Sequence, residues 1–306
     1  MNSMTMRTAF MLLLLASFSI DSGFSNDRTG SGLAFLRIGV GARASGMGEA
    51  FVAVSDDASA TYWNPAGCAL IEKTEVMFMN NSFIQDISQE FVAVVTSFGD
   101  FKVGGAFNLV NLGTLEKRDE TGELRGEFKP FDLAASFSLA YPVMDWVDVG
   151  TSVKGVMEDI DTETAYGALF DVGFILRLPV DGLSVGGVVQ NIGPAIKFID
   201  VAFDAPRTWR GGVSYVRTIV GFSSQVGLAL DLVSPMDDDF QVNVGGEVEY
   251  NEIVAGRLGF RGGADTQGIT TGIGVRYRGF IIDYAYVPFS ENLGNTHRIG
   301  ISYRFR

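Results

Sequence analysis

The chain has 306 residues, 47% of them hydrophobic, which is enough for one large domain or, alternatively, two small ones. Its formal net charge of −13 argues against nucleic-acid binding, because phosphate recognition depends on clustered basic side chains. The acidic balance fits either a solvated surface or a cation-rich partner. The only cysteine, Cys68, cannot form an intramolecular disulfide, and we expect it to be a small buried apolar residue.

The first 25 residues have the pattern of a secretory signal peptide. Arg7 supplies the positive region, an apolar core follows at residues 9–20, and small residues at 19–25 form the expected cleavage zone. This apolar run is too short to span a bilayer, and no later stretch approaches ~20 consecutive apolar residues. We therefore expect export without a helical anchor, which leaves the periplasm, the cell surface or a β-barrel in the outer membrane.

Residues 26–72 predict a compact plug. Small residues recur from 39 to 48, an apolar segment spans 50–54, and turn-forming residues follow at 55–57. Glycine lets a backbone approach a surrounding wall closely, and Asp57 can cap a short helix over residues 58–63. The alternative is a glycine-rich loop leading into a soluble domain. As plug-defining residues we nominate Arg37, Gly46, Gly48, Asp56, Asp57, Trp63, Asn64, Pro65 and Gly67.

In residues 73–306, apolar residues alternate with small and polar ones in several segments, and this pattern predicts a series of strands. Each candidate has about the 9–11 residues that a tilted strand needs to cross a bilayer, or a few more. The sequence therefore predicts an all-β fold: a transmembrane antiparallel β-barrel of about fourteen strands, with an N-terminal plug, or hatch, of short helices and loops. The strand candidates lie near residues 74–83, 88–98, 101–112, 129–141, 146–157, 164–177, 183–191, 207–216, 222–233, 240–250, 253–261, 268–277, 279–287 and 297–305.

The charged residues distinguish this barrel from a soluble sandwich, which would also alternate. A cation that faces lipid at mid-depth costs ~2–4 kcal/mol, so a membrane barrel keeps charges off its apolar row. The first two strands alternate poorly, with Val92, Val94 and Phe98 on the face of Glu90, and we expect these strands to face the plug. Elsewhere the charges share the small and polar row: Lys102, Asp132, Lys154, Asp171, Arg210, Asp231, Arg257, Arg276 and Asp283.

The connections alternate in length, as in outer-membrane barrels with short periplasmic turns and longer outer loops. With the plug on the periplasmic side, the even-to-odd links are short, and the odd-to-even links are mostly longer and often acidic. The link at residues 113–129 is the expected partner-contacting loop. Aromatic residues at strand ends, such as Trp146, Tyr250 and Tyr277, fit an interfacial girdle.

The last strand resembles the terminal strand that serves assembly in outer-membrane barrels. Ile299, Ile301, Tyr303 and Phe305 form its apolar row, and Arg306 after the final aromatic departs from that pattern.

The segment GARASGMGEAFVAVSDDASATYWNPAG resembles the N-terminal signature of the PorV/PorQ family. These outer-membrane barrels are related to the FadL fatty-acid transporters and are associated with type IX secretion. The resemblance implies a fourteen-stranded barrel occluded by an N-terminal hatch, with Asn64 and Pro65 matching the NPA element of the hatch. It also implies a Gram-negative type outer membrane as the location.

No pattern of residues predicts an enzyme, a cofactor or a metal site. His297 is the only histidine, so a histidine-rich metal site is excluded and a catalytic triad would have to use the start of the last strand. The run Asp237-Asp238-Asp239 fits solvated charge better than Ca²⁺ binding, because no glycine-bearing ligand loop surrounds it. Gly46-x-Gly48 lacks the third glycine of a nucleotide loop.

Three functional hypotheses remain open. The first, favoured by the resemblance, is a role in type IX secretion, in which the barrel binds cargo sorting domains or partner components at the cell surface. The second is a FadL-like transporter for hydrophobic small molecules such as long-chain fatty acids. The third is a plugged barrel without transport. The expected partners are outer-membrane lipid, the barrel assembly machinery, secreted proteins with C-terminal sorting domains and other secretion components, but no nucleic acid.

Overall fold

The computed structural model describes residues 32–199, 201–263, 268–290 and 294–305. The expected signal peptide and the first residues of the expected plug, 26–31, lie outside this range. Among the described residues, no helix is both long and apolar enough to cross a membrane.

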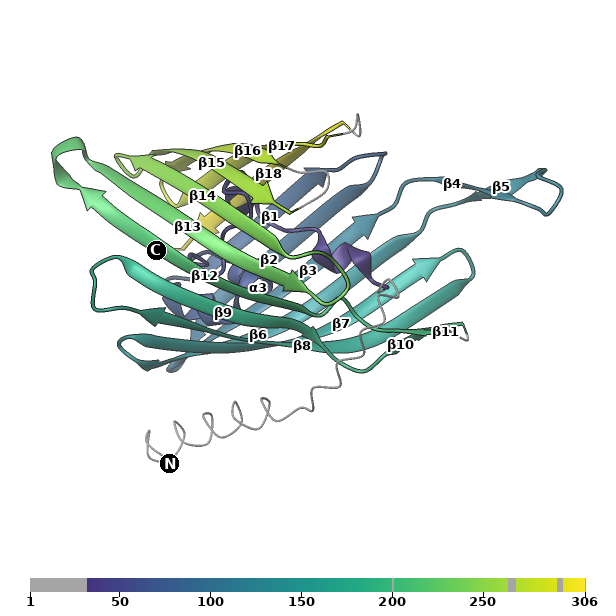
Figure 1. Ribbon diagram of the computed structural model, residues 1–306, viewed down its shortest axis with the longest axis horizontal. Helices are drawn as coiled ribbons and strands as arrows, with labels where there is room; N and C mark the ends of the chain where they lie inside the picture. Colours follow the sequence, from purple (N-terminus) through teal and green to yellow (C-terminus); the bar gives the residue numbers. More distant parts are fainter. Residues whose placement is uncertain (1–31, 200, 264–267, 291–293, 306) are drawn as a thin grey trace, which may run out of the picture. The chain divides into compact units, whose positions relative to one another are not determined.

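Fourteen antiparallel strands of the described chain close into one barrel (Figure 1). Neighbouring barrel strands pair in chain order, and β1 closes the barrel against β18. This confirms the predicted antiparallel barrel, and each predicted strand matches an observed one to within a few residues at its ends. The strands are β1 (Glu75–Ser82), β2 (Ser88–Phe98), β3 (Phe101–Asn111), β6 (Phe131–Met144), β7 (Val147–Ile160), β8 (Glu163–Arg177), β9 (Leu183–Ile192), β12 (Thr208–Ile219), β13 (Ser224–Pro235), β14 (Gln241–Tyr250), β15 (Val254–Gly262), β16 (Ile269–Tyr277), β17 (Phe280–Pro288) and β18 (Asn295–Arg304).

Two links predicted as loops contain hairpins of their own. Strands β4 (Leu115–Arg118) and β5 (Leu124–Phe128) pair outside the barrel sheet, as do β10 (Ile196–Phe198) and β11 (Val201–Phe203). We call the end of the barrel that carries these hairpins the loop end, and the opposite end the turn end. The turn end also carries the short 3-10 helix η3 (Val220–Phe222). The link between β7 and β8 is only two residues long, although it belongs to the links expected to be longer.

The two faces of the barrel wall differ in polarity. Outward-facing leucine, isoleucine, valine and phenylalanine side chains are exposed along most strands, and Trp146, Tyr250 and Tyr277 are exposed at the turn end. The predicted inward row of charges is confirmed, because all nine residues are at least partly buried, six of them fully: Asp132, Lys154, Asp171, Asp231, Arg257 and Asp283.

Strands β1 and β2 alternate poorly because both of their faces are apolar. Their inward row, which includes Met79, Phe91 and Val95, is buried in a hydrophobic cluster with residues of the N-terminal segment. Their outward row includes Val92 and Val94, which are exposed. The prediction that these strands face the N-terminal segment is therefore confirmed, although through the row opposite to Val92 and Val94.

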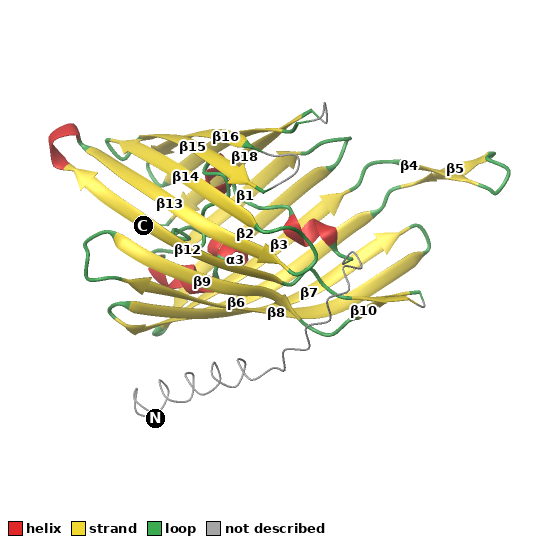
Figure 2. Ribbon diagram, in the orientation of Figure 1, coloured by secondary structure: helices red, strands yellow, loops and turns green. Residues whose placement is uncertain are grey.

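Residues 32–72, which we call the lumenal segment, lie inside the barrel as four short helices joined by turns (Figure 2). These helices are η1 (Ala34–Arg37), α2 (Ala42–Gly46), α3 (Ala60–Trp63) and η2 (Pro65–Leu70). Helix α2 contacts β15 to β18, whereas η2 contacts β3 and β6 to β8. The helix expected at 58–63 starts only at Ala60, with Ser59 as its N-cap; Asp57 instead accepts the backbone N–H of Ser59 at 3.0 Å.

Candidate functional site

Inward-facing glycines of the wall let the backbone of the lumenal segment touch the strands. A Cβ atom added to Gly259 would lie 2.0 Å from the backbone nitrogen of Gly48, and one on Gly245 would lie 2.4 Å from the carbonyl oxygen of Met47. Since Cβ atoms cannot approach backbone atoms so closely, only glycine fits at these positions. Gly48 itself has a φ of +64°, a conformation that favours glycine. The wall glycines that contact backbone atoms of the lumenal segment are Gly150, Gly186, Gly245, Gly259 and Gly272, and Gly173 contacts the side chain of Asn64.

Arg43 of α2 is the centre of a buried ion-pair network. Its Nε and Nη2 donate to both carboxylate oxygens of Glu247 at 3.0 and 2.9 Å. The same guanidinium pairs with Asp56 and, at 3.4 Å, with Asp57. Glu247 also accepts from Arg257 at 2.6 Å, so one carboxylate on the wall holds two arginines. A bidentate pair of this geometry is strong, and removal of one partner would leave a buried charge uncompensated.

Three further carboxylates tie the lumenal segment to the wall. Asp231 on β13 accepts the backbone N–H groups of Phe51 and Val52 at 2.7 and 2.9 Å. Glu75 on β1 accepts the N–H of Ala58 at 3.0 Å. In the opposite direction, Glu49 of the lumenal segment pairs with wall arginines, at 3.2 Å from Arg261 and 3.5 Å from Arg298.

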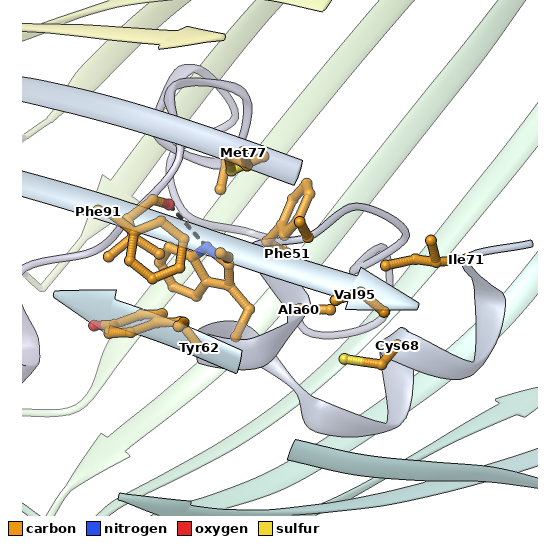
Figure 3. Packing of buried hydrophobic residues seen from close by; sticks show 14 of the residues in the cluster. Phe51, Ala60, Tyr62, Cys68, Ile71, Met77, Phe91 and Val95 are labelled. Atoms are coloured by element: carbon orange, nitrogen blue, oxygen red, sulfur yellow. Dashed lines mark hydrogen bonds between the residues drawn. The ribbon is translucent and has the colours of Figure 1, made fainter. Parts of the chain in front are cut away.

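Trp63 and Asn64 form the packed centre of the lumenal segment. The Trp63 indole donates to the carbonyl of Val40 at 2.9 Å and packs edge-on against Tyr62, 4.9 Å between ring centroids. Figure 3 shows the surrounding cluster, with Phe51, Tyr62 and Phe91 close together. The buried Asn64 amide donates to the carbonyls of Val52 and Phe174 and accepts from Ala66, so it fixes a turn and a strand at once.

The structure brings together most of the residues nominated from the sequence. Gly46 lies against Gly272 of the wall, Pro65 lies against Gly150, and a Cβ atom on Gly67 would lie 2.0 Å from the Ser55 carbonyl oxygen. Gly48, Asp56, Asp57, Trp63 and Asn64 have the contacts described above. Arg37 lies apart from them, at the loop end, where it pairs with Asp237 and Asp238 at 3.4 and 3.2 Å. Of the nominated last-strand residues, three are exposed and one is partly buried: Ile299, Ile301, Phe305 and Tyr303.

The residues missed by sequence reasoning are the partners of these positions. Arg43, Glu247 and Arg298 make the strongest polar contacts of the lumenal segment, yet none was nominated. Arg43 and Glu247 are 204 residues apart, so no local pattern links them. The sequence feature that could have identified Glu247 is a charged residue on an inward row next to glycines, here Gly245 and Gly246.

In the acidic run, Asp238 and Asp239 are exposed, as expected of solvated charge, whereas Asp237 is partly buried. Arg37 pairs with Asp237 and Asp238. Within the described residues, no group of three or more histidine, cysteine, aspartate or glutamate side chains is placed to hold a metal ion. His297 faces outward, with its Nδ1 2.7 Å from the Tyr284 hydroxyl.

An apolar site occupies the loop end of the lumen. Leu33, Phe35 and Leu36 of the first turn of the lumenal segment are buried there. The turn is held by the Tyr62 hydroxyl, which donates to the Leu36 carbonyl at 2.9 Å, and by the Arg37 ion pairs. The apolar side chains around this loop-end site are Val110, Ala134, Val156, Ala165 and Leu169 of the barrel wall and Ile196 of β10.

A second space lies at the turn end, between the lumenal segment and the ends of β8, β9 and β12 to β14. This turn-end cleft has a volume of about 280 Å³. Its lining mixes apolar side chains, such as Val54, Ile175 and Val216, with the Arg43, Asp56 and Glu247 network.

Strand β8 contacts both sites, and its inward row gives their order along the barrel. Leu169 faces the loop-end site, Asp171 is buried and pairs with Lys154 at 2.8 Å, Gly173 contacts Asn64, and Ile175 lines the turn-end cleft. Leu169 and Ile175 are six positions apart on the strand, or about 20 Å at the usual rise per residue. The part of the lumenal segment around Asn64 therefore lies between two separate sites.

Solved structures of hydrocarbon channels share the fold of this chain. The fold is similar to that of the CymD monoaromatic hydrocarbon channel, with a TM-score of 0.62 and 15% identity over 90% of this chain and 99% of that one. The Pseudomonas putida toluene transporter TodX has a TM-score of 0.64 and 12% sequence identity, and the match covers 87% of this chain and 97% of that one. A Pseudomonas aeruginosa FadL homologue has a TM-score of 0.53 and 13% sequence identity, and the match covers 86% of this chain and 98% of that one. At these identities the likeness defines the fold class, a FadL-like barrel.

The chain belongs to the uncharacterised protein family UPF0164, whose family model matches residues 4–166, just over half of the sequence. No curated protein matches it at a significant level. The resemblance to PorV/PorQ proteins stays a prediction.

Proposed function

We propose that this protein is an outer-membrane barrel that admits small hydrophobic molecules from the loop end and passes them inward around the lumenal segment. The outward apolar rows support the membrane location, because such a surface is stable in lipid and is a liability in water. The FadL-like fold supports the class of ligand, since CymD and TodX are described as a monoaromatic hydrocarbon channel and a toluene transporter.

The apolar loop-end site is the observation that carries this proposal. A water-filled porin has a polar interior throughout, and most of this lumen is indeed lined by charges and glycines. Toward the loop end, the inward rows of β3, β6, β7 and β8 carry Val110, Ala134, Val156, Ala165 and Leu169, which pack into one apolar cluster. The buried Asp132 and the partly buried Glu158 lie just beyond this cluster. An enclosed apolar surface of this kind binds hydrocarbon by removing it from water.

The first turn of the lumenal segment covers this site, so a ligand must displace it. Helix η1 is a single four-residue 3-10 turn, a unit with little stability of its own. Leu33 before it has a left-handed backbone, φ 57° and ψ 38°, which is strained for a branched side chain. In contrast, residues 43–67 are held by buried ion pairs and by the wall glycines. The turn therefore moves more easily than the rest of the segment.

Uptake of radiolabelled toluene tests the proposal. Cells that express the full chain in a lipopolysaccharide-containing outer membrane should take up toluene faster than cells with the empty vector, whereas uptake of a disaccharide should not change. Leu169→Asn, in the loop-end site, should reduce toluene uptake, and the matched outward substitution Leu230→Asn should not. Both variants are first checked for the folded, heat-modifiable barrel. Equal toluene uptake with and without the protein contradicts the proposal.

A role in secretion is a second candidate, favoured by one observation. The β4–β5 hairpin projects beyond the barrel at the loop end (Figure 1), and nearly all of its residues are exposed. Such a projection suits contact with another protein, such as a secreted protein with a C-terminal sorting domain. Deletion of residues 115–128 should then abolish co-purification with those proteins while the barrel stays folded. Unchanged co-purification would count against this role.

A further inference from the structure

The turn-end cleft has the composition of a binding site. Its volume of about 280 Å³ is close to the lower end of the ~300–1,000 Å³ that is usual for small-molecule sites. Its apolar lining comes from Met47, Val54 and Leu70 of the lumenal segment and from Ile175 and Val216 of the wall. Apolar side chains from both the segment and the wall can enclose a hydrocarbon body.

The charged side chains around the cleft already have partners. Arg43 is paired with Asp56, Asp57 and Glu247, and Arg177 is paired with Asp148. A charged ligand would therefore find no free counter-ion and would have to break an existing pair, which is costly at a buried site. The lining thus favours an uncharged molecule.

Two polar side chains of the lining have no partner among the described residues. The Ser184 hydroxyl at the start of β9 and the Gln225 amide at the start of β13 make no hydrogen bond to the described residues. Ser214, which pairs with Ser184 in the sheet, instead donates to the Ala53 carbonyl at 3.1 Å. Between them, Ser184 and Gln225 offer donors and acceptors to a ligand.

We propose that the turn-end cleft is a second ligand site, for an uncharged molecule that combines a small hydrocarbon body with a hydroxyl or carbonyl group. The body lies between Val54 and Val216, and its polar group bonds to Ser184 on one side of the cleft or to Gln225 on the other. The site differs in chemistry from the loop-end site, whose cluster around Leu33, Phe35 and Leu36 is apolar. It goes beyond the proposed transport function, because its test is binding and does not require uptake.

The test compares 4-iodophenol with iodobenzene on the full chain. Crystals soaked in 4-iodophenol should give an anomalous iodine peak in the turn-end cleft. In lipid nanodiscs, Ser184→Ala combined with Gln225→Leu should weaken 4-iodophenol binding by about threefold to tenfold, the range for one lost hydrogen bond, and should leave iodobenzene binding unchanged. The exposed substitution Ser223→Ala, in the β12–β13 turn, is the matched control.

Filling the cleft gives a second, independent result. Val216→Trp on the wall, or Val54→Trp on the lumenal segment, should remove the iodine peak, whereas Val94→Trp on the outward row should not. The second site is wrong if the iodine peaks lie only outside the turn-end cleft. It is also wrong if neither the polar nor the filling substitutions change the affinity for 4-iodophenol. If the protein takes up toluene but 4-iodophenol gives no iodine peak in the turn-end cleft, the second ligand site is wrong and the transport proposal stands. If the iodine peak appears in the cleft but the protein takes up no toluene, the transport proposal is wrong and the second ligand site stands.

Discussion

Single carboxylates hold the lumenal segment at points where its backbone has no helix or strand partner. Asp231 is the clearest example, because one of its oxygens accepts two consecutive N–H groups, those of Phe51 and Val52. Buried N–H groups must find an acceptor, and here the wall supplies it. Such a contact fixes the position of the segment as well as its stability.

Replacement of Asp231 by alanine should loosen this part of the segment. Two buried N–H groups would lose their acceptor, at a cost of about 1–3 kcal/mol each when no water replaces it. We expect much faster hydrogen exchange at Phe51 and Val52 in the folded barrel, measured by mass spectrometry of peptides from this region. Asp181→Ala, in an exposed turn, is the control. Unchanged exchange at Phe51 and Val52 would show that Asp231 does not hold them.

Cys68 should be unreactive as long as the protein is folded. Its side chain is fully buried in η2, and burial raises the pKa of the thiol to about 12. Because the pKa lies far above neutral pH, almost no reactive thiolate is present at pH 7.5. We expect no labelling by a maleimide at pH 7.5 in the native barrel and full labelling after denaturation, both measured by mass spectrometry. Rapid native labelling would mean that the lumenal segment opens often.

At the level of elements, the wall glycines make the strands and the lumenal segment one packed unit. Gly259→Ala should disrupt this packing, because its Cβ would overlap the backbone of Gly48. Overpacking typically costs about 1–3 kcal/mol, and more where backbone must move. On the same strand, Gly256 has no atom within 4 Å of an added Cβ, so Gly256→Ala is a matched control. The urea midpoint of unfolding in micelles should fall for Gly259→Ala only; equal midpoints would contradict the contact.

The elements differ in how far the sequence predicts them. The barrel strands could be predicted because alternation with a period of two is a local property of each strand. The β4–β5 hairpin could not, since both of its faces are exposed and no alternation is required. Strands β10 and β11 have only three residues each, too few to show a period of two, although Ile196 is buried. The helix at Ala60 is shorter than expected because Asp57 bonds to Ser59 instead of capping it.

The candidate site was predictable only in part. The small residues of the lumenal segment and the turn at Asn64 and Pro65 are visible in the sequence because close packing and tight turns demand particular residue types. Their partners on the wall are set by how the barrel closes, and closure brings together residues as distant as Arg43 and Glu247. The sequence therefore predicted one side of several contacts, such as those of Gly48 and Asn64, but neither side of the Arg43–Glu247 pair.

For the whole molecule, the outward surface should behave as a lipid-facing one. Leu258, on β15, and Leu124, on the β4–β5 hairpin, are similarly exposed, at 61% and 55%. If the barrel lies in a membrane and the hairpin lies beyond it, Leu258→Arg should cost about 2–4 kcal/mol of folding free energy in lipid and Leu124→Arg should cost almost nothing. Reversible unfolding from lipid vesicles measures both values. Equal, small effects would place β15 in water.

The close fit between wall and lumenal segment also dictates an order of assembly. Backbone contacts with Gly150, Gly245 and Gly259 leave no clearance, so the segment cannot be threaded through a finished cylinder. It has to be in position while the sheet is still open. The final seam reflects this, because Glu75 on the first strand bonds both to Ala58 of the segment and to Arg304 of the last strand. The first and last strands can thus pair correctly only around a lumenal segment that has already folded.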